Sequence, residues 1–117
     1  MREDVRYQLD SEFEQAAVAR TKGKEGKARV CCRRAAGIAI REYFYQCGET
    51  FTGKSSIELI KSLSNLPETS PDIIEICNHL TLRVSEDFTL PADVDLLEET
   101  RLLCKVLLPD WNPKSSD

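Results

Sequence analysis

The stretch KARVCCRRAAGIAIREYFYQC, residues 27–47, decides the fold, because it is the longest run of the chain with helical periodicity. Small and apolar side chains recur in it every three or four positions, which is the spacing of one face of an α-helix. Alanine and cysteine are small, so a neighbouring helix can approach this face closely. The residues that we predict to form this core face are Ala28, Cys32, Ala35, Ala36, Ala39, Tyr43 and Cys47.

The segments on either side of this stretch are also predicted to be helical. Apolar residues stepping by three and four indicate a first helix over residues 2–20, and TKGKEG, residues 21–26, is typical of a connecting turn. Ser55, Ser70 and Asp93 are capping residues that open helices over residues 56–66, 71–84 and 94–108. Trp111 is expected to fold back over the bundle. The predicted fold class is therefore all-α: a single-domain antiparallel bundle of about five helices over residues 1–111, followed by a flexible tail at 112–117.

Composition is typical of a soluble globular protein. A length of 117 residues accommodates one domain, and 41% apolar with 31% charged residues is an ordinary balance for a packed core. No run approaches the roughly 20 apolar residues of a membrane span, and the charged start MREDVRYQLD lacks the apolar region of a signal peptide. The five cysteines include no C-x-x-C spacing, which argues against a disulfide framework or a zinc site. We therefore predict a cytoplasmic protein without membrane association.

The stretch GETFTGKS, residues 48–55, fits the phosphate-binding pattern G-x-x-x-x-G-K-[ST]. A working P-loop follows a buried β-strand and opens a helix, whereas both flanks of this stretch are predicted to be helical. We interpret Gly48 as a C-terminal helix cap, Gly53 and Lys54 as solvated turn residues, and Ser55 as an N-terminal cap. The stretch is therefore predicted to be a loop between two capped helices, and no cofactor is expected.

Positive charge is concentrated in one part of the chain. From Arg20 to Arg41 there are eight basic residues and one acidic residue, in a chain whose net charge is −4. Such a stretch can bind phosphate groups or RNA, or it can be neutralised within the fold by Asp95, Glu98 and Glu99. Its first members lie at or near a helix N-terminus, which normally favours acidic residues. The candidate phosphate- or RNA-binding residues are Lys24, Lys27, Arg29, Arg33 and Arg34.

His79 is the only histidine, so a catalytic dyad that needs histidine would have to use it. At 100° per residue it lies about 120° from the apolar face of its helix, so we expect an exposed His79 beside a buried, unreactive Cys77. Neither a second histidine nor a spaced cysteine pair accompanies it. We predict no metal site and no catalytic residue, and we favour a non-enzymatic function.

The end of the 27–47 helix is apolar on more sides than one core face requires. Ile40, Phe44 and Tyr45 leave almost no polar side there, which is typical of a central helix or of one covered by a second protein molecule. We therefore regard these three residues as candidates for an oligomer interface and predict a homodimer.

Residues 33–65, RRAAGIAIREYFYQCGETFTGKSSIELIKSLSN, resemble the HEPN superfamily of helical bundles. In that family a long helix with small residues at this spacing, then a basic residue and an apolar end, leads through a glycine-containing loop into a short helix. Catalytic HEPN ribonucleases carry an arginine four to six residues before a histidine, and no arginine stands at that distance before His79. The resemblance therefore implies a non-catalytic member: a dimer that associates with a protein partner such as a nucleotidyltransferase.

Two functions follow from these observations. The leading prediction is a small cytoplasmic, non-catalytic, HEPN-like interaction module. The alternative is a nucleotide- or RNA-binding protein that uses the basic start of the second helix. An interaction module should expose an apolar patch, whereas a nucleic-acid binder should expose a basic surface whose affinity falls with salt.

Overall fold

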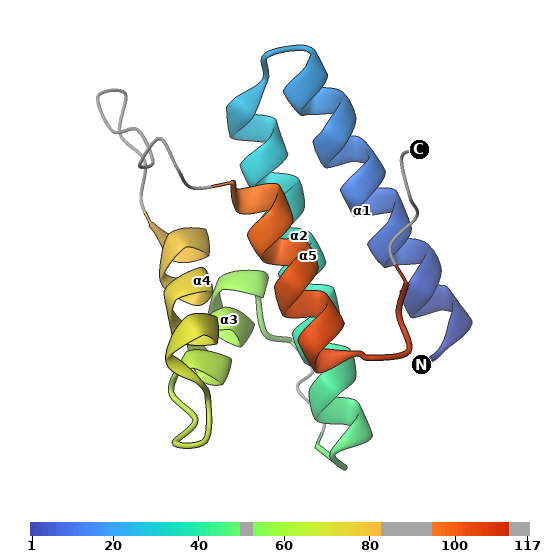
Figure 1. Cartoon of the computed structure of the whole chain (residues 1–117). Coiled ribbons are helices and arrows are strands. Elements are labelled where there is room, and N and C mark those ends of the chain that lie inside the picture. The colour runs from blue at the N-terminus through green and yellow to red at the C-terminus, as the bar shows by residue number, and fades with distance from the viewer. Residues whose placement is uncertain (50–52, 83–94, 113–117) are drawn as a thin grey trace.

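The computed structural model describes residues 1–49, 53–82 and 95–112, and within these ranges the chain forms five α-helices and no β-strand (Figure 1). The helices are α1 (Glu3–Thr21), α2 (Glu25–Gln46), α3 (Ser56–Ser64), α4 (Pro71–Thr81) and α5 (Leu96–Leu107). This arrangement confirms the predicted all-α bundle. No helix in these ranges is long and apolar enough to cross a membrane. Of the predicted tail, residues 113–117 lie outside the described residues.

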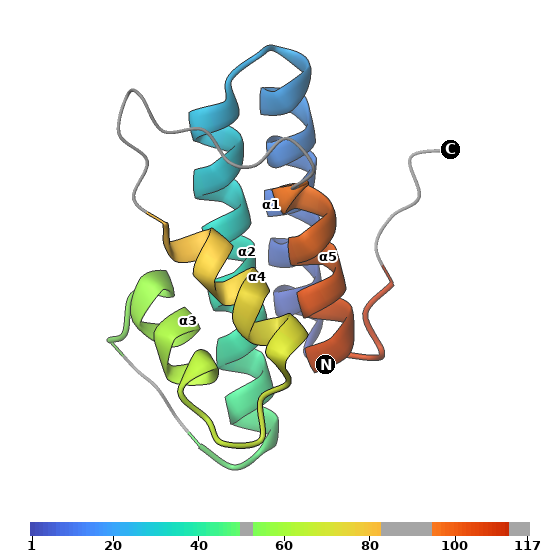
Figure 2. The ribbon, with the colours of Figure 1, turned by 60° about the vertical axis from the view of Figure 1, so that its left-hand side comes forward.

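Helix α2 is the central element, because all four other helices pack against it. It forms an antiparallel hairpin with α1, and α5 lies along this hairpin (Figures 1 and 2). Helices α3 and α4 pair with each other beside the half of α2 that is farther from the α1–α2 turn. The core therefore surrounds α2 on several sides rather than along one stripe.

The predicted core face of α2 is largely confirmed, but it is broader than expected. Its three central alanines, Ala35, Ala36 and Ala39, are fully buried. Cys47 is exposed instead of buried, because α2 ends at Gln46 and Cys47 already belongs to the turn. Tyr43 is only partly buried. Residues outside the predicted face are buried in their place, because α2 has neighbours on several sides: Cys31, Ile40, Glu42 and Phe44.

Helix α3 meets α2 at Gly37. A Cβ atom at this position would lie 2.5 Å from Oγ, 2.9 Å from Cβ and 3.0 Å from Cα of Ser56, the first residue of α3. Separations this short are far inside van der Waals distance, so no other residue fits here without moving α3. Glycine costs helix stability relative to alanine. Its presence in the middle of α2 is explained by this close approach.

The loop between α2 and α3 is capped at both ends, as predicted for GETFTGKS. Its two glycines have φ angles of +87° and +81°, which favour glycine. The Ser55 hydroxyl accepts a hydrogen bond from the Glu58 amide, and the Glu58 carboxylate accepts one from the Ser55 amide. Lys54 is not simply solvated, because its Nζ donates to the Ser62 hydroxyl at 3.4 Å. Residues 50–52 of this loop lie outside the described residues.

The predicted bounds of the last three helices need correction, and the first of these, α3, ends at Ser64 rather than at residue 66. Ser70 caps α4 through the Ile73 amide as predicted, but α4 ends at Thr81, because Leu82 has an extended backbone with ψ of 131°. Helix α5 is capped by Asp95, whose own backbone is extended and whose Oδ1 accepts from the Glu98 amide at 3.2 Å. The predicted cap, Asp93, and residue Val84 lie outside the described residues.

The C-terminal segment covers one end of the core, as expected for Trp111. The indole is fully buried, stacks on Phe13 with 5.2 Å between ring centroids, and donates from Nε1 to Asp10 at 3.2 Å. Lys105 holds this segment against α5, because its Nζ donates to the backbone oxygens of Pro109 and Trp111 at 2.7 and 2.9 Å. The chain directly beyond α5 is thus part of the fold.

Candidate functional site

Two of the five basic candidates serve the fold. Arg33 donates from Nε to the carbonyl oxygen of Leu80 at 2.7 Å and from Nη2 to that of Leu82 at 3.3 Å. These oxygens lie at the C-terminal end of α4, where carbonyls lack helical partners and the helix dipole is negative. Arg34 pairs with Glu12 of α1 at 3.1 Å. Arg33 therefore caps α4 and Arg34 joins α1 to α2.

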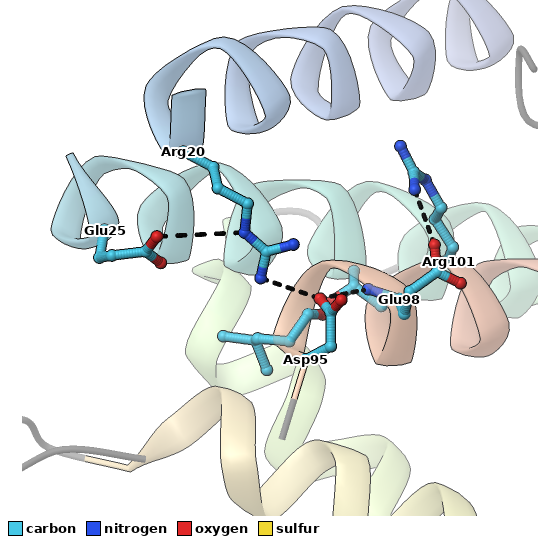
Figure 3. A network of polar contacts seen from close by, with 7 residues as sticks. Arg20, Glu25, Asp95, Glu98 and Arg101 are labelled. Carbon is cyan, nitrogen blue, oxygen red and sulfur yellow. Dashed lines mark hydrogen bonds and ion pairs between the residues drawn. The ribbon is translucent and has the colours of Figure 1, made fainter. Parts of the chain in front are cut away.

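Another basic residue, Arg20, joins the end of α1 to the start of α5 (Figure 3). Its Nη2 donates to Asp95 Oδ1 at 2.9 Å, and its Nε lies 4.0 Å from a Glu25 oxygen. The hydrogen bond from Arg20, together with backbone amides at the start of α5, holds the pKa of Asp95 below its ordinary value of 3.8. Asp95 is thus both the cap of α5 and the ionic partner of α1.

The three acids expected to neutralise the basic candidates have other partners. Asp95 pairs with Arg20, Glu98 pairs with Arg101 at 2.8 Å, and the Glu99 carboxylate lies 2.7 Å from Nδ1 of His79. Within the described ranges, the candidates Lys24, Lys27 and Arg29 therefore gain no ion pair from α5.

The lowered pKa of Asp95 predicts a pH-dependent contribution to stability. Asp95→Asn keeps a capping oxygen but removes the charge, and we expect a loss of less than about 1 kcal/mol at pH 6, because the pair with Arg20 is partly exposed. The folded-state pKa lies below 3.8, so this contribution is complete above that value and disappears as the pH falls through the folded-state pKa. Urea unfolding of both proteins between about pH 6 and pH 3 measures the difference. A difference that stays constant over this range would contradict the assignment.

Four basic side chains at the α1–α2 turn form no ion pair or hydrogen bond within residues 1–49, 53–82 and 95–112. They are Lys22, Lys24, Lys27 and Arg29. The three lysines are exposed and line a surface hollow of about 330 Å³. The remainder of its lining comes from α1: Ser11, Glu14, Gln15, Val18 and Ala19. The structure thus brings two predicted candidates, Lys24 and Lys27, together in one site and adds Lys22.

The hollow has the chemistry of an anion site. Three ammonium groups supply donors and positive charge, while a serine hydroxyl and a glutamine amide supply further donors at its side. Lys24 is also the N-cap residue of α2 and makes no side-chain cap, so the positive end of this long helix opens beside the hollow. The hollow's volume is at the small end of the range for ligand sites. No sequence pattern pointed to the α1 residues that line the hollow, because their contribution depends on how the hairpin packs.

The prediction that His79 is exposed is wrong. Only 16% of its side chain is accessible, because it lies between α4 and α5, where its Nδ1 meets Glu99 and its Nε2 lies 3.9 Å from Glu75. Cys77 is buried as predicted, and burial raises the pKa of its thiol to about 11, which leaves it unreactive near neutral pH. The residues that the structure describes contain no group of three potential metal ligands.

The three interface candidates do not form one exposed surface. Ile40 and Phe44 are buried in the core of their own chain, at 0% and 4% exposure, so their apolar character needs no second molecule. Tyr45 is 52% exposed, and the Arg2 guanidinium lies 4.0 Å above its ring. Arg2 also donates to the buried carboxylate of Glu42 at 2.6 and 2.9 Å. The burial of Glu42 was not predicted from the sequence, in which the only indication was an acidic residue within an apolar run.

No protein-family model, no curated protein and no solved structure matches this chain. The helical bundle is observed directly in the structure, whereas the HEPN resemblance of residues 33–65 stays a hypothesis.

Proposed function

We propose that this protein binds a phosphate-bearing ligand of the nucleotide or RNA class at the α1–α2 end of the bundle. The observation that supports it best is the convergence of Lys22, Lys24 and Lys27 on one hollow without an ionic partner in the described part of the chain. Four basic side chains gathered at one turn repel each other, and the nearby acids offset this only in part, because Glu14 lines the hollow without an ion pair to them and Glu25 lies 4.0 Å from Arg20. A phosphate group removes that repulsion.

The side chains at the hollow favour contact with phosphates over contact with bases. Lysine ammonium groups act as flexible point charges, which suits a phosphodiester backbone. Among the residues that the structure describes, the lining contains no aromatic ring on which a base could stack, and Tyr43 and Tyr45 belong to the opposite end of α2. Binding should therefore depend little on base sequence and strongly on salt.

Salt dependence gives the first test of the site. With three lysine contacts to a single strand, the logarithm of affinity should fall with a slope of about −2 against the logarithm of salt concentration, which is roughly a 20-fold loss from 50 to 200 mM. Lys24→Ala should weaken binding and reduce the magnitude of this slope by about 0.7, which is the contribution of one lysine contact. Fluorescence anisotropy with labelled single-stranded RNA and with a labelled nucleotide measures both quantities.

Lys61→Ala is the matched control. Lys61 is an exposed lysine of α3, beside the other half of α2, so its removal changes net charge equally without touching the hollow (Figures 1 and 2). Binding should stay nearly unchanged in this variant. Absence of binding to either ligand at low salt, or an equal loss in both variants, would contradict the proposed site.

The HEPN-like interaction module is the second candidate, and one observation favours it. Leu102 and Val106 of α5 lie four residues apart on one helix face, with 55% and 54% of each residue exposed. Such a pair can anchor a protein partner, for which the resemblance suggests a nucleotidyltransferase. A complex with such a partner that Leu102→Glu abolishes and Lys24→Ala leaves intact would favour this function over ligand binding at the hollow.

A further inference from the structure

The outward face of α1 changes from acidic to basic along its length. Asp4, Tyr7, Ser11, Glu14, Val18 and Lys22 are spaced by three or four residues, so they lie along one side of the helix. Tyr7 is 76% exposed and Val18 is 47% exposed, although both could bury apolar surface. The face thus has an acid at its start, a second acid, Glu14, between its two exposed apolar side chains, and a lysine at its end.

The charges at the two ends of this face form no ion pair within the described part of the fold, although Asp4 stands in the first turn of α1 and acts electrostatically on Arg2. There, neither Asp4 nor Lys22 forms an ion pair or a side-chain hydrogen bond. The exposed face of α5 differs, although it also has two apolar side chains. Its charged residues already have partners, because Glu98 pairs with Arg101 and Lys105 holds the C-terminal segment. Of these two faces, the one on α1 keeps complementary charges that remain open to a second molecule.

We propose that this face of α1 pairs antiparallel with the same face of a second copy of the chain. Asp4 lies nine residues before Phe13 and Lys22 nine residues after it, so a two-fold axis near Phe13 sets Asp4 of each copy opposite Lys22 of the other. The same axis brings Tyr7, six residues before Phe13, next to Val18 of the other copy, five residues after it. One face therefore pairs its two terminal charges and covers its own apolar residues, as a two-fold interface requires, while Glu14 of each copy lies near the axis.

This pairing does not rest on the proposed ligand, but it involves the same hollow. Lys22 lines the hollow, so Asp4 of the second copy would supply the anionic group there. The dimer and a phosphate-bearing ligand are therefore alternative occupants of the basic end. Ligand binding is best measured at protein concentrations below the association range.

Charge exchange tests the pairing directly. Sedimentation equilibrium of the full chain should show reversible association that weakens when salt rises. Asp4→Lys and Lys22→Glu should each weaken association at least about 10-fold, because each replaces two attractive contacts per dimer by two repulsive ones. The double variant Asp4→Lys/Lys22→Glu exchanges the two charges and should recover association to within about threefold of the wild type.

Two further variants separate this surface from others. Tyr7→Ala should weaken association, whereas Leu102→Glu, which places a charge on the exposed face of α5, should leave it unchanged. Thermal unfolding confirms that the variants are folded, since all of these positions are at the surface. A chain that stays monomeric up to several hundred micromolar, a charge exchange that restores nothing, or a loss of association in Leu102→Glu alone would overturn the proposal.

Discussion

Gly37→Ala is expected to destabilise the protein by about 2–3 kcal/mol, which is a large fraction of the stability of a domain of this size. The added methyl group would meet Ser56 at 2.5–3.0 Å, and one of the three close atoms belongs to the backbone of α3. A side-chain rotation cannot move that atom, so α3 has to shift away from α2. The gain in helix propensity from alanine, about 1 kcal/mol, offsets only part of this cost.

Gly26→Ala is the matched control for this prediction. Gly26 lies in the first turn of α2, and a methyl group there would meet only the flexible end of Arg29, at 3.9 Å. This variant should be neutral or more stable by up to about 1 kcal/mol. Urea unfolding followed by far-ultraviolet circular dichroism measures both variants, and only Gly37→Ala should lose stability.

A double variant tests the cause of the Gly37 effect. Gly37→Ala/Ser56→Gly removes the Oγ and Cβ atoms that the new methyl group would meet, while the clash with the backbone of residue 56 remains. The double variant should therefore recover part of the stability that Gly37→Ala loses, with a coupling free energy of about 1 kcal/mol or more. If Gly37→Ala proved as stable as the wild type, the close packing of α2 and α3 would be contradicted.

Helix number and type could be predicted because they depend on local patterns. The three-and-four spacing of apolar residues and the caps at Ser55 and Ser70 are set within a few residues of sequence. The bounds of α5 were less predictable, since Asp93 and Asp95 are chemically equivalent caps. Only the observed extended backbone and the Glu98 amide identify Asp95.

The residues that line the candidate site could not be predicted from the sequence alone. Lys27 and Arg34 lie seven residues apart on the same helix, yet one lines the hollow and the other is paired with Glu12. This difference depends on which residue of α1 lies opposite, and that follows from the tertiary packing of the hairpin. Arg33 is likewise a helix cap only because α4 ends beside it.

The same limit applies to Ile40 and Phe44, two of the three oligomer candidates. A helix that is apolar nearly all round is either central or covered by another molecule, and periodicity does not distinguish the two. The structure places Ile40 and Phe44 in the chain's own core. Exposed apolar side chains lie on several helices, among them Tyr7 and Val18 on α1, whose outward face had no unusual pattern in the sequence.

Trp111→Ala should have the second large effect, a loss of about 3–5 kcal/mol, because the indole is fully buried and its removal leaves a cavity beside Phe13. Trp111→Phe keeps an aromatic ring against Phe13 but loses the hydrogen bond from Nε1 to Asp10, so about 1–2 kcal/mol should be lost. Val106→Ala, which shortens a side chain on α5 that is 54% exposed, is the control and should change stability by less than about 0.5 kcal/mol.

Trp111 is also the only tryptophan, so its emission reports on its own environment. In the folded wild type the spectrum should be that of a buried indole, and it should shift to longer wavelength in the same urea range in which circular dichroism reports loss of helix. Coincident transitions mean that the segment after α5 unfolds together with the bundle. An earlier shift in emission, or a Trp111→Ala variant of nearly wild-type stability, would show instead that this segment is only a loosely attached end.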